Sequence, residues 1–368
     1  MILTVNMGSS TCKCALFSIV KNSVLPDPLW EKKIEWNKKN DINSVSYQIH
    51  NELKDLPIKF ICHRVVHGGK YFFEPTLLDK KTIKKIQSLN DLAPLHNPLN
   101  VKGILAFQKA FSNTSQYACF DTAFHRDLPK QIYTYPIPLN WLKKGIRKYG
   151  FHGISFEYCI NRYYELTKKT NQKIICCHLG SGCSAASIQG YSSLNTTMGF
   201  TPLDGLMMGT RSGTIDTSAV TYLMKKKTMQ DIEKMLFTQS GLKGIYGKSS
   251  DMRTIEDQIV KGNDKAQLAY DLFLEILVET LGKLFFSLGG MDTLIFTGGI
   301  GENMAKLRFD VCNRLKVIDC IIDEKKNKQV EQDMSICSTK SKKDIFVIYT
   351  KENWQMAKNC FKYYSTIK

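Results

Sequence analysis

The sequence lacks the features that would place it among zinc proteins or disulfide-stabilised proteins. Its 12 cysteines include no Cys-x-x-Cys pair, and most lie in apolar patterns typical of buried strands or helices, as around Cys62 and Cys176. This predicts buried free thiols in a reducing cytoplasm. His63 and His67 have the spacing of two helical metal ligands, but they lie in a strand-like run without the glutamate of a zinc-protease motif. A zinc site is therefore not predicted.

The sequence also shows no long uncharged apolar run and no pattern typical of a secretory leader. The most apolar region, 266–288, carries four charged residues at four-residue spacing, which predicts an amphipathic core helix and not a membrane span. The N-terminus has no basic segment followed by an apolar core and a small-residue cleavage site. We therefore expect a cytoplasmic protein without a membrane partner.

Arginine-rich tracts and aromatic-basic recognition motifs are absent too, although the net charge is +17. The lysines occur in small dispersed groups, which is typical of a solvated basic surface that attracts anionic nucleotides. We expect no nucleic-acid partner. Gly247-Lys248-Ser249 resembles the end of a P-loop, but Leu242 stands where that motif needs a glycine.

Two stretches of the chain share one design. Residues 174–188 form an apolar run, a turn through 180–182 and a second small, mostly apolar run; residues 2–17 repeat this pattern around Gly8-Ser9-Ser10, with Lys13 on the second strand. Glycine turns let backbone N–H groups approach an anion, because glycine has no Cβ. One such turn alone is an ordinary hairpin. Two, one opening each half of 368 residues, predict a duplicated fold with a phosphate held between the halves.

The remaining pattern alternates strands and helices. We expect strands at 30–36, 57–66, 116–120, 293–296 and 344–349, and helices at 42–53, 101–111, 155–167, 217–225, 229–237, 266–288 and 352–363. A glycine-rich loop is expected at 240–250 and a solvated lysine-rich excursion at 323–343. Arg64 and Asp121 fall at or near strand ends, where α/β proteins place their sites. Gly298 and Gly299 place helix N-terminal amides where a nucleotide can bind.

Ten short motifs, taken in order, resemble the acetate kinase family. They are NMGSSTCK (6–13), HRVVHGG (63–69), APLHNP (93–98), FDTAFH (120–125), KYGFHG (148–153), HLGSG (178–182), MGFTPLDGLMMGTRSG (198–213), SSDMR (249–253), FTGGIGEN (296–303) and TKEN (350–353). Each is weak alone, but together they span nearly the whole chain and are highly specific.

The resemblance implies an α/β protein with the duplicated actin-like ATPase (ribonuclease H-like) fold, which has two lobes and the active site in the cleft between them. It places an N-terminal lobe at 1–149, completed by the C-terminal helix 355–368, and a nucleotide-binding lobe at 150–354. It also implies a homodimer.

The resemblance further implies roles for the matching residues. Asn6 and Glu352 would help to place Mg²⁺ or Mn²⁺, and Lys13 would lie near the transferring phosphate. The catalytic set would be Arg64, which binds the acyl group, the carboxylate of Asp121, and His152 and Arg211, which stabilise the transition state.

Two groups of matching residues would bind the substrates. The acyl pocket would be formed by Val66, Leu95, Phe151 and Pro202 with Arg64, and His96 would contact the phosphoryl group. ATP or ADP would be bound by three segments: His178, Leu179, Gly180, Ser181 and Gly182; Asp251, Met252 and Arg253; and Gly298, Gly299, Ile300, Gly301 and Glu302.

These residue types suit phosphoryl transfer between ATP and a carboxylate, because two anions must approach each other. Two arginines, a histidine and Mg²⁺ neutralise that charge, and guanidinium groups hold carboxylate or phosphoryl oxygens through paired hydrogen bonds. Acetate is already ionised at neutral pH, so Asp121 is expected to orient metal or substrate and not to remove a proton. The implied function is a Mg²⁺-dependent acetate kinase that reversibly transfers a phosphoryl group from ATP to acetate by direct in-line transfer.

Alternatives remain at this point. The same family includes propionate and butyrate kinases, and the fold also serves nucleotide-binding proteins with little transfer activity. Taken singly, Arg64 fits a structural ion pair, Asp121 a helix cap and Glu352 a first-turn acid, while His152 fits a turn; the joint pattern favours the functional interpretation. Departures from the family pattern occur at Phe156, Ser181, Asn195, Thr214, Thr217 and Lys351.

Overall fold

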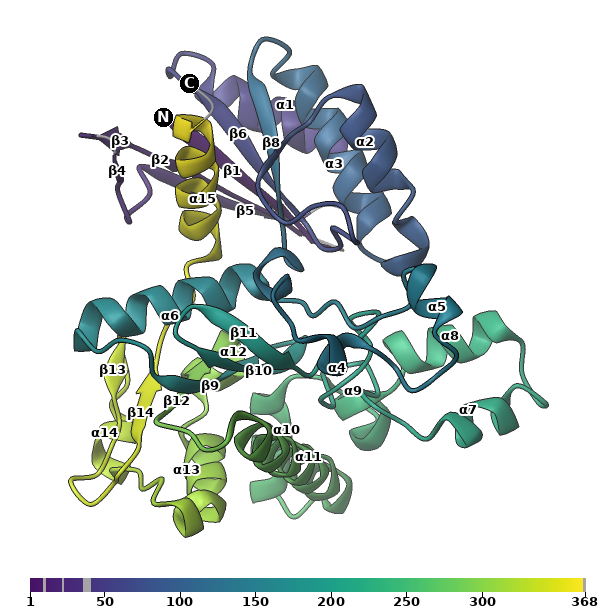
Figure 1. Ribbon diagram of the computed structural model, residues 1–368, viewed down its shortest axis with the longest axis vertical. Helices are drawn as coiled ribbons and strands as arrows, with labels where there is room; N and C mark the ends of the chain where they lie inside the picture. The colour runs from purple at the N-terminus through teal and green to yellow at the C-terminus, as the bar shows by residue number, and fades with distance from the viewer. Residues whose placement is uncertain (9–10, 22, 36–40, 367–368) are drawn as a thin grey trace. The chain divides into compact units, whose positions relative to one another are not determined.

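The computed structural model describes residues 1–8, 11–21, 23–35 and 41–366, and it divides into two compact units (Figure 1). Unit 1 comprises Met1–Arg126, Phe151–Tyr158 and Lys351–Lys368, and unit 2 comprises Asp127–Gly150 and Cys159–Thr350. This division differs from the predicted boundary between 149 and 150, because 127–150 packs with unit 2. Ser9 and Ser10 of the first predicted turn, and Trp36 of a predicted strand, lie outside the described residues.

The sheet of unit 1 has the strand order β5-β2-β1-β6-β8-β7. Its strands are β1 (Ile2–Met7), β2 (Thr11–Phe17), β5 (Trp30–Glu35), β6 (Phe60–Val65), β7 (Thr76–Leu77) and β8 (Ser115–Phe120), with a separate ribbon of β3 (Ile19–Val20) and β4 (Ser23–Val24). β1 and β2 form the predicted antiparallel hairpin, whereas β1, β6 and β8 run parallel. The carboxyl ends of these three strands therefore meet at one edge of the sheet.

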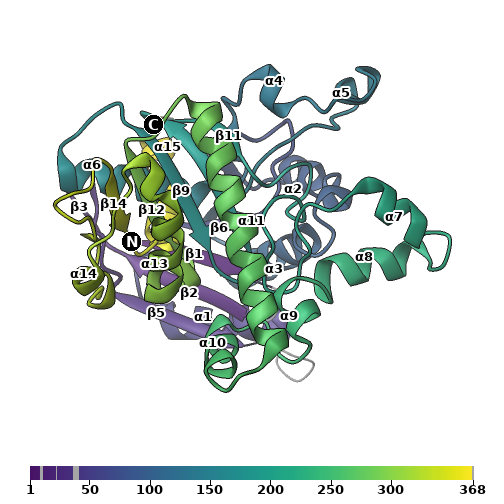
Figure 2. The same cartoon turned by 90° about the horizontal axis from the view of Figure 1, so that it is seen from below.

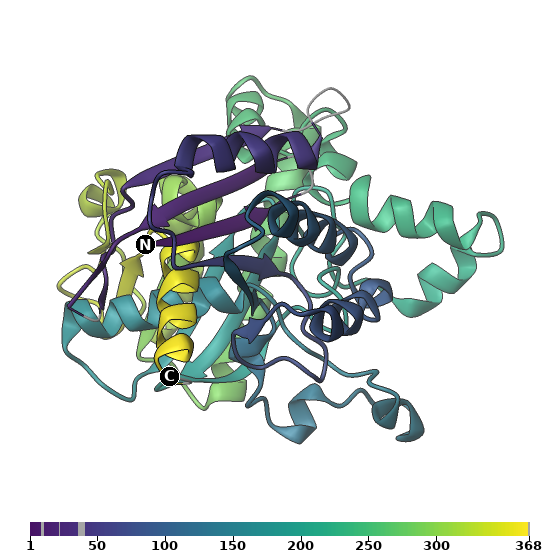
Figure 3. The same cartoon turned by 90° about the horizontal axis from the view of Figure 1, so that it is seen from above.

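Helices cover both faces of this sheet. One face packs Leu3 and Val5 against α1 (Ile42–Leu53) and α3 (Asn97–Ala110). The other packs Ile2 and Cys62 against α15 (Glu352–Thr366), the yellow helix that crosses the purple strands in Figure 3. Alternate residues of each strand thus face different helices, as the period of two requires. Unit 1 also holds α2 (Lys80–Gln87) and the short turns η1 (Asn90–Leu92) and η2 (Ala123–His125).

Unit 2 repeats the strand pattern of unit 1, which confirms the predicted duplication. Its sheet has the order β11-β10-β9-β12-β14-β13, with β9 and β10 antiparallel and β9, β12 and β14 parallel. The strands are β9 (Lys173–Leu179), β10 (Cys183–Gln189), β11 (Ser192–Thr196), β12 (Thr293–Thr297), β13 (Met334–Ser335) and β14 (Asp344–Val347). The long amphipathic helix predicted over 266–288 is α11 (Asp264–Leu288), which lies across this sheet in Figure 2.

The other helices are mostly short. They are α4 (Lys130–Tyr133), α5 (Asn140–Lys143), α6 (Gly153–Thr167), α7 (Thr217–Leu223), α8 (Met229–Thr238), α9 (Gly241–Tyr246), α10 (Met252–Val260), α12 (Gly298–Asn303), α13 (Ala305–Arg314), η3 (Leu315–Ile318) and α14 (Glu324–Lys328). Among the described residues no helix is long and apolar enough to cross a membrane. All 12 cysteines are free, and all but the half-buried Cys337 are buried, as predicted.

Two segments differ from the sequence expectation. The predicted loop at 240–250 contains α9, which begins at Gly241. Gly241 has φ +64°, and a side chain there would lie 2.1 Å from the Met208 carbonyl oxygen, so this position requires glycine. The lysine-rich segment 323–343 is not a solvated excursion, since it contains α14 and the strand β13, which pairs with β14. The prediction relied on the high lysine content and did not identify the few apolar and polar residues that hold this segment against the sheet.

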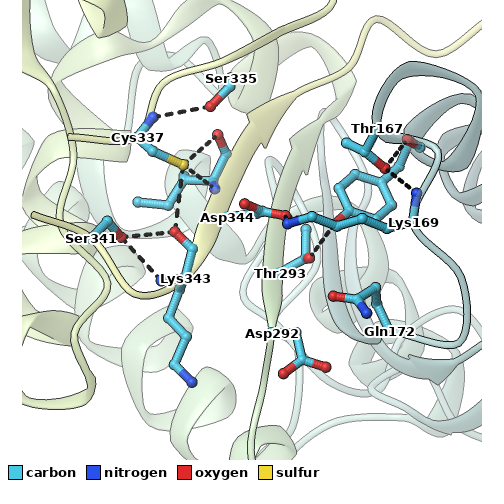
Figure 4. Close-up of polar contacts among 12 residues, drawn as sticks. Thr167, Lys169, Gln172, Asp292, Thr293, Ser335, Cys337, Ser341, Lys343 and Asp344 are labelled. Carbon is cyan, nitrogen blue, oxygen red and sulfur yellow. Dashed lines mark hydrogen bonds and ion pairs between the residues drawn. The ribbon is translucent and has the colours of Figure 1, made fainter. Parts of the chain in front are cut away.

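Polar contacts at the start of β12 and β14 show how this segment is held (Figure 4). The Ile345 N–H donates to Cys337 Sγ at 2.8 Å, and the Ser341 hydroxyl donates to the Lys343 carbonyl at 2.7 Å. On the neighbouring strand, the Thr293 hydroxyl donates to the Tyr163 hydroxyl at 2.8 Å, which in turn donates to Asp344 at 2.7 Å. The segment before β14 is therefore anchored to the sheet.

Candidate active site

A charged cluster lies where β1, β6 and β8 end in unit 1. Arg64, on β6, donates from Nε and Nη2 to the two carboxylate oxygens of Asp121 at 2.9 and 2.6 Å, and from Nη1 to Asn6 Oδ1 at 3.2 Å. The Asn6 amide nitrogen lies 3.5 Å from Glu352 Oε2. Four residues predicted from separate parts of the chain are thus joined in one hydrogen-bonded array.

The strand register explains why these residues meet. Side chains alternate between the two faces of a strand, and the residues of β1, β6 and β8 that face α15 are every second one. This alternation places Asn6, Arg64 and Asp121 on the α15 face, each at or just past the carboxyl end of its strand. α15 begins at Glu352, so its packing on this face delivers the glutamate to the same edge. Lys13 pairs directly with Asn6 in the β1–β2 ladder, so its side chain lies on the same face of the sheet.

Burial and charge set the protonation of this array. Burial opposes the charge of Arg64, but the carboxylates of Asp121 and Glu352 outweigh it and raise the pKa of the guanidinium. Burial, together with the charge of Glu352, raises the pKa of the Asp121 carboxyl, and Arg64 opposes that shift. Asp121 is only 1% exposed. Because an arginine stays protonated, the two-point ion pair keeps Asp121 ionised at neutral pH.

Two buried asparagines hold the end of β6 in place. Asn97 Oδ1 accepts from the His67 N–H at 3.0 Å, and Asn97 Nδ2 donates to the His67 carbonyl at 3.1 Å. Asn100 Oδ1 accepts from the Val66 N–H at 3.1 Å, and its amide donates to the Met7 carbonyl at 3.1 Å. Sequence reasoning missed this role. The helix was predicted to begin only at 101, four residues after the observed start of α3, although two asparagines three residues apart were the available signal.

His152 has an unusual backbone. Its φ is +57°, in the left-handed region that residues with a Cβ rarely adopt, and it directly precedes α6. The next residue, Gly153, donates its N–H to the Asp121 carbonyl at 2.9 Å, and a side chain at Gly153 would lie 2.2 Å from that oxygen. The FHG motif thus attaches His152 to the chain just after β8, and its strained conformation is the kind found at functional sites.

The predicted acyl-pocket residues of unit 1 have different surroundings. Phe151 is buried, its ring lies edge-on to His67 at 5.2 Å, and its carbonyl lies 3.0 Å from His125 Nε2. Val66 is also buried, next to His67. Leu95 is 42% exposed, and it lies with His96 just before α3. The structure therefore places Phe151 beside the end of β6 and leaves Leu95 at the surface of this unit.

In unit 2, two of the three predicted nucleotide segments lie against each other. Gly298, with φ +76°, packs so closely on Leu179 that a side chain would lie 2.7 Å from the Leu179 carbonyl oxygen. Glu302 Oε1 accepts from the N–H groups of Gly298 at 2.9 Å and Thr350 at 3.0 Å. The turn at 298–302 is thus fixed at both ends beside the turn that follows β9.

The third predicted nucleotide segment, 251–253, follows Ser250, which lies near Gly209. The Gly209 N–H donates to the Ser181 carbonyl at 3.1 Å, and a side chain at Gly209 would lie 3.4 Å from Ser250 Cβ. Asp251 caps α10 and pairs with Arg253 Nη2 at 2.7 Å. The Arg253 side chain is exposed, and its guanidinium is a suitable partner for a phosphate.

Arg211 lies in the long loop between the end of β11 at Thr196 and the start of α7 at Thr217. Its Nη1 donates to the Pro202 carbonyl at 2.9 Å and lies 3.4 Å from Met208 Sδ. The Met208 N–H donates to the Arg211 carbonyl at 3.1 Å, which closes a tight turn. Two predicted site residues of unit 2, Arg211 and Pro202, are therefore in direct contact.

Comparison with known proteins decides the family. The profile of the Acetokinase family matches residues 37–358. An acetate kinase of Gloeothece citriformis (strain PCC 7424) is 40% identical, with 98% of each chain covered. The chain belongs to the acetokinase family. Among solved structures, acetate kinase of Porphyromonas gingivalis has 32% identity and a TM-score of 0.87, covering 100% of this chain and 99% of the other. A propionate kinase of Francisella tularensis has 34% identity and a TM-score of 0.89, covering 97% and 98%.

Acetokinase membership confirms the predicted fold class, the duplicated two-domain α/β ATPase fold. The positions that depart from the family pattern are each accommodated locally. Phe156 is fully buried against His125, with ring centroids 5.7 Å apart. The Thr214 hydroxyl donates to Asp204 at 2.7 Å, and Asn195 donates to the Ser287 hydroxyl at 3.2 Å.

Three other departures also have defined places. Ser181 accepts from Gly209 through its carbonyl, so the contact does not depend on its side chain. Thr217 is the first residue of α7 after the cap Asp216, and Lys351 pairs with Asp27 at 3.4 Å. The departures therefore alter packing and surface contacts without removing a member of the Arg64 array.

The donors beside Arg64 suit a magnesium ion. Asn6 Oδ1 and the Glu352 carboxylate are hard oxygen ligands, and Mg²⁺ commonly binds one or two carboxylates together with substrate phosphates. The adjacent Asn353 Oδ1 is buried and has no hydrogen-bond partner among the described residues. No cluster of three or more His, Cys, Asp or Glu ligands occurs in the described part of the chain. Asn6 and Glu352 thus offer two oxygen ligands, which fits an open metal site and not a closed protein cage.

Proposed function

We propose that this protein is a Mg²⁺-dependent acetate kinase that reversibly converts ATP and acetate to ADP and acetyl phosphate. The observation that carries the proposal is the array of Asn6, Arg64, Asp121 and Glu352 at one sheet edge, in a chain of the acetokinase family. We further propose a cytoplasmic homodimer.

Arg64 is the proposed ligand of the acyl carboxylate. Among the described residues, Asp121 and Asn6 use three of its five N–H groups, which leaves one on Nη1 and one on Nη2 for an anion. Asp121 fixes the guanidinium plane and supplies no proton transfer, because acetate is already ionised at neutral pH. The carboxylate oxygen attacks the γ-phosphorus as the bond to the ADP oxygen breaks, so no proton has to move.

The remaining residues have supporting roles in this proposal. His152 and Arg211 stabilise the charge on the equatorial phosphoryl oxygens, and Lys13 and His96 lie near the same group. Asn6 and Glu352 would hold Mg²⁺, which neutralises the β- and γ-phosphate oxygens when it is bound. The segments 178–182, 251–253 and 298–302 are the proposed nucleotide contacts, and Val66, Leu95, Phe151 and Pro202 are the proposed contacts of the acyl methyl group.

Acetate-dependent ADP release tests this function. The protein with ATP and Mg²⁺ should release ADP only when acetate is added, and acetyl phosphate with ADP should yield ATP. Direct in-line transfer also predicts inversion at a γ-phosphorus made chiral with oxygen isotopes. Retention would indicate a phosphorylated protein intermediate, and acetate-independent ADP release would contradict the kinase assignment.

Propionate is the second candidate acceptor, because the Francisella tularensis neighbour is described as a propionate kinase. One methylene changes discrimination by only about 1–3 kcal/mol, so neighbouring acids will both react to some degree. The ratio of kcat/KM for acetate, propionate and butyrate ranks them. A ratio above one for propionate over acetate would replace the first proposal with the second.

A further inference from the structure

Arg308 is a buried arginine that the proposed chemistry does not use. It lies on α13, is 1% exposed and is the largest fully buried side chain of the described residues. Its Nη1 donates to the carbonyls of Gly301 and Glu302, both at 2.8 Å. These are two of the last carbonyls of α12, the turn that carries the proposed nucleotide contacts.

Asn327 holds the other side of the guanidinium. Arg308 Nε donates to Asn327 Oδ1 and Nη2 donates to the Asn327 carbonyl, both at 2.8 Å. The Asn327 amide donates to the Ala305 carbonyl at 2.7 Å, at the start of α13. Within the part of the chain that the structure describes, Arg308 therefore donates only to neutral oxygens, and the plane of its guanidinium is fixed from two directions.

The segment that carries Asn327 is itself tied to the sheet. The Asn327 N–H donates to the Asp323 carbonyl at 2.9 Å, and the Asp323 N–H donates to the Ile336 carbonyl at 2.9 Å. The Ile336 N–H then donates to the Ile345 carbonyl of β14 at 2.8 Å. A chain of hydrogen bonds thus runs from β14 through α14 to Arg308 and on to α12. The lysine-rich segment has a structural connection to the nucleotide turn.

α12 needs such support because it has only six residues. A helix of this length is unstable alone, and its last carbonyls lack partners within the helix. Glu302 fixes the N-terminal end through the Gly298 N–H, and Arg308 fixes the C-terminal end. A four-point fork can hold two carbonyls and a partner residue at once, which a lysine cannot do.

We infer that Arg308, braced by Asn327, is a positioning residue that holds the 298–302 turn in its nucleotide-binding shape. The inference rests on the proposed function, since it assumes that this turn binds the nucleotide. It predicts that loss of the brace weakens nucleotide binding and leaves the acyl site, which lies on other segments, unchanged.

The test compares Arg308→Lys and Asn327→Ala with matched controls. Arg314→Lys changes an exposed arginine of the same helix, paired with Glu275, and Lys328→Ala changes an exposed lysine beside Asn327. Kd for Mg-ATP is measured by calorimetry, and KM for ATP and for acetate are measured separately. Both test variants should raise Kd and KM for ATP about tenfold with KM for acetate within about twofold, and both controls should match the parent protein.

Other outcomes overturn the inference or separate it from the function. Equal changes in both KM values, or a lowered melting temperature with unchanged ATP affinity, would show a purely structural role. Asn327→Ala retains the two bonds from Arg308 to α12, so it keeps the test available if Arg308→Lys does not fold. If the parent protein binds ATP but makes no acetyl phosphate, the proposed function is wrong. The comparison of Kd values still shows whether Arg308 and Asn327 hold the 298–302 turn in its nucleotide-binding shape.

Discussion

Removing Arg64 should damage stability and activity for different reasons. Arg64→Met leaves the Asp121 carboxylate, 1% exposed, without its two-point partner. Breaking a buried ion pair on one side costs about 3–5 kcal/mol, and we expect about 3 because the Arg64 side chain is 20% exposed and water can reach the vacated site. The same change should lower kcat/KM for acetate by about 10²–10³-fold, since a preorganised charge is lost.

The double variant Arg64→Met/Asp121→Asn separates the two effects. It no longer buries an unpaired charge, so urea unfolding should show that most of the lost stability returns. Activity should stay at the level of the single variant, because the acyl anion still lacks its ligand. Recovery of kcat/KM in the double variant would refute the role of Arg64 as a substrate ligand and leave it a structural partner of Asp121. Near-normal activity of the single variant would do the same.

Three further predictions concern other parts of the molecule. Burial lowers the pKa of His63 to about 4, so between pH 6.5 and about 4 the unfolded chain binds a proton that the folded protein does not. The free energy of unfolding should therefore fall by up to about 3 kcal/mol as the pH falls through this window, and urea titrations of His63→Leu should not show this fall. Gly153→Ala should lower the free energy of unfolding by about 1–3 kcal/mol, because its Cβ would lie 2.2 Å from the Asp121 carbonyl oxygen. Gly282→Ala, on α11 with open space around it, should instead raise the melting temperature. Glu352→Gln should raise the Mg²⁺ concentration for half-maximal activity at least about tenfold, and a chelator should abolish turnover of the parent protein until Mg²⁺ is restored; an unchanged Mg²⁺ requirement would remove Glu352 from the metal site.

Local patterns predicted much of the fold. The helix expected at 42–53 has those bounds because Asp41 accepts from the Ser44 N–H at its start and the apolar residues recur on one face. The hairpin at 174–188 formed as its two apolar runs and central glycines indicated. By contrast, α9 was missed because glycine lowers helix propensity, and the close packing of Gly241 on Met208 comes from a distant part of the chain.

The site shows the same limit. Motifs identified Arg64 and Asp121, and the parallel register of β6 and β8 explains how residues 57 apart in sequence meet. Nothing in local sequence showed that Asn97 would hold His67, or that Arg308 would find its partner 19 residues later in a lysine-rich segment. Such contacts depend on which segments tertiary packing brings together, which periodicity and composition do not encode.

Acyl phosphate trapped as hydroxamate tests the central claim most directly. The protein is incubated with ATP, Mg²⁺, acetate and hydroxylamine beside an Arg211→Ala variant, which lacks the guanidinium that donates to the Pro202 carbonyl. We expect acetyl hydroxamate from the parent protein and a loss of about 10²-fold or more in the variant. ATP binding with no hydroxamate from the parent protein, or equal product from both proteins, would contradict it.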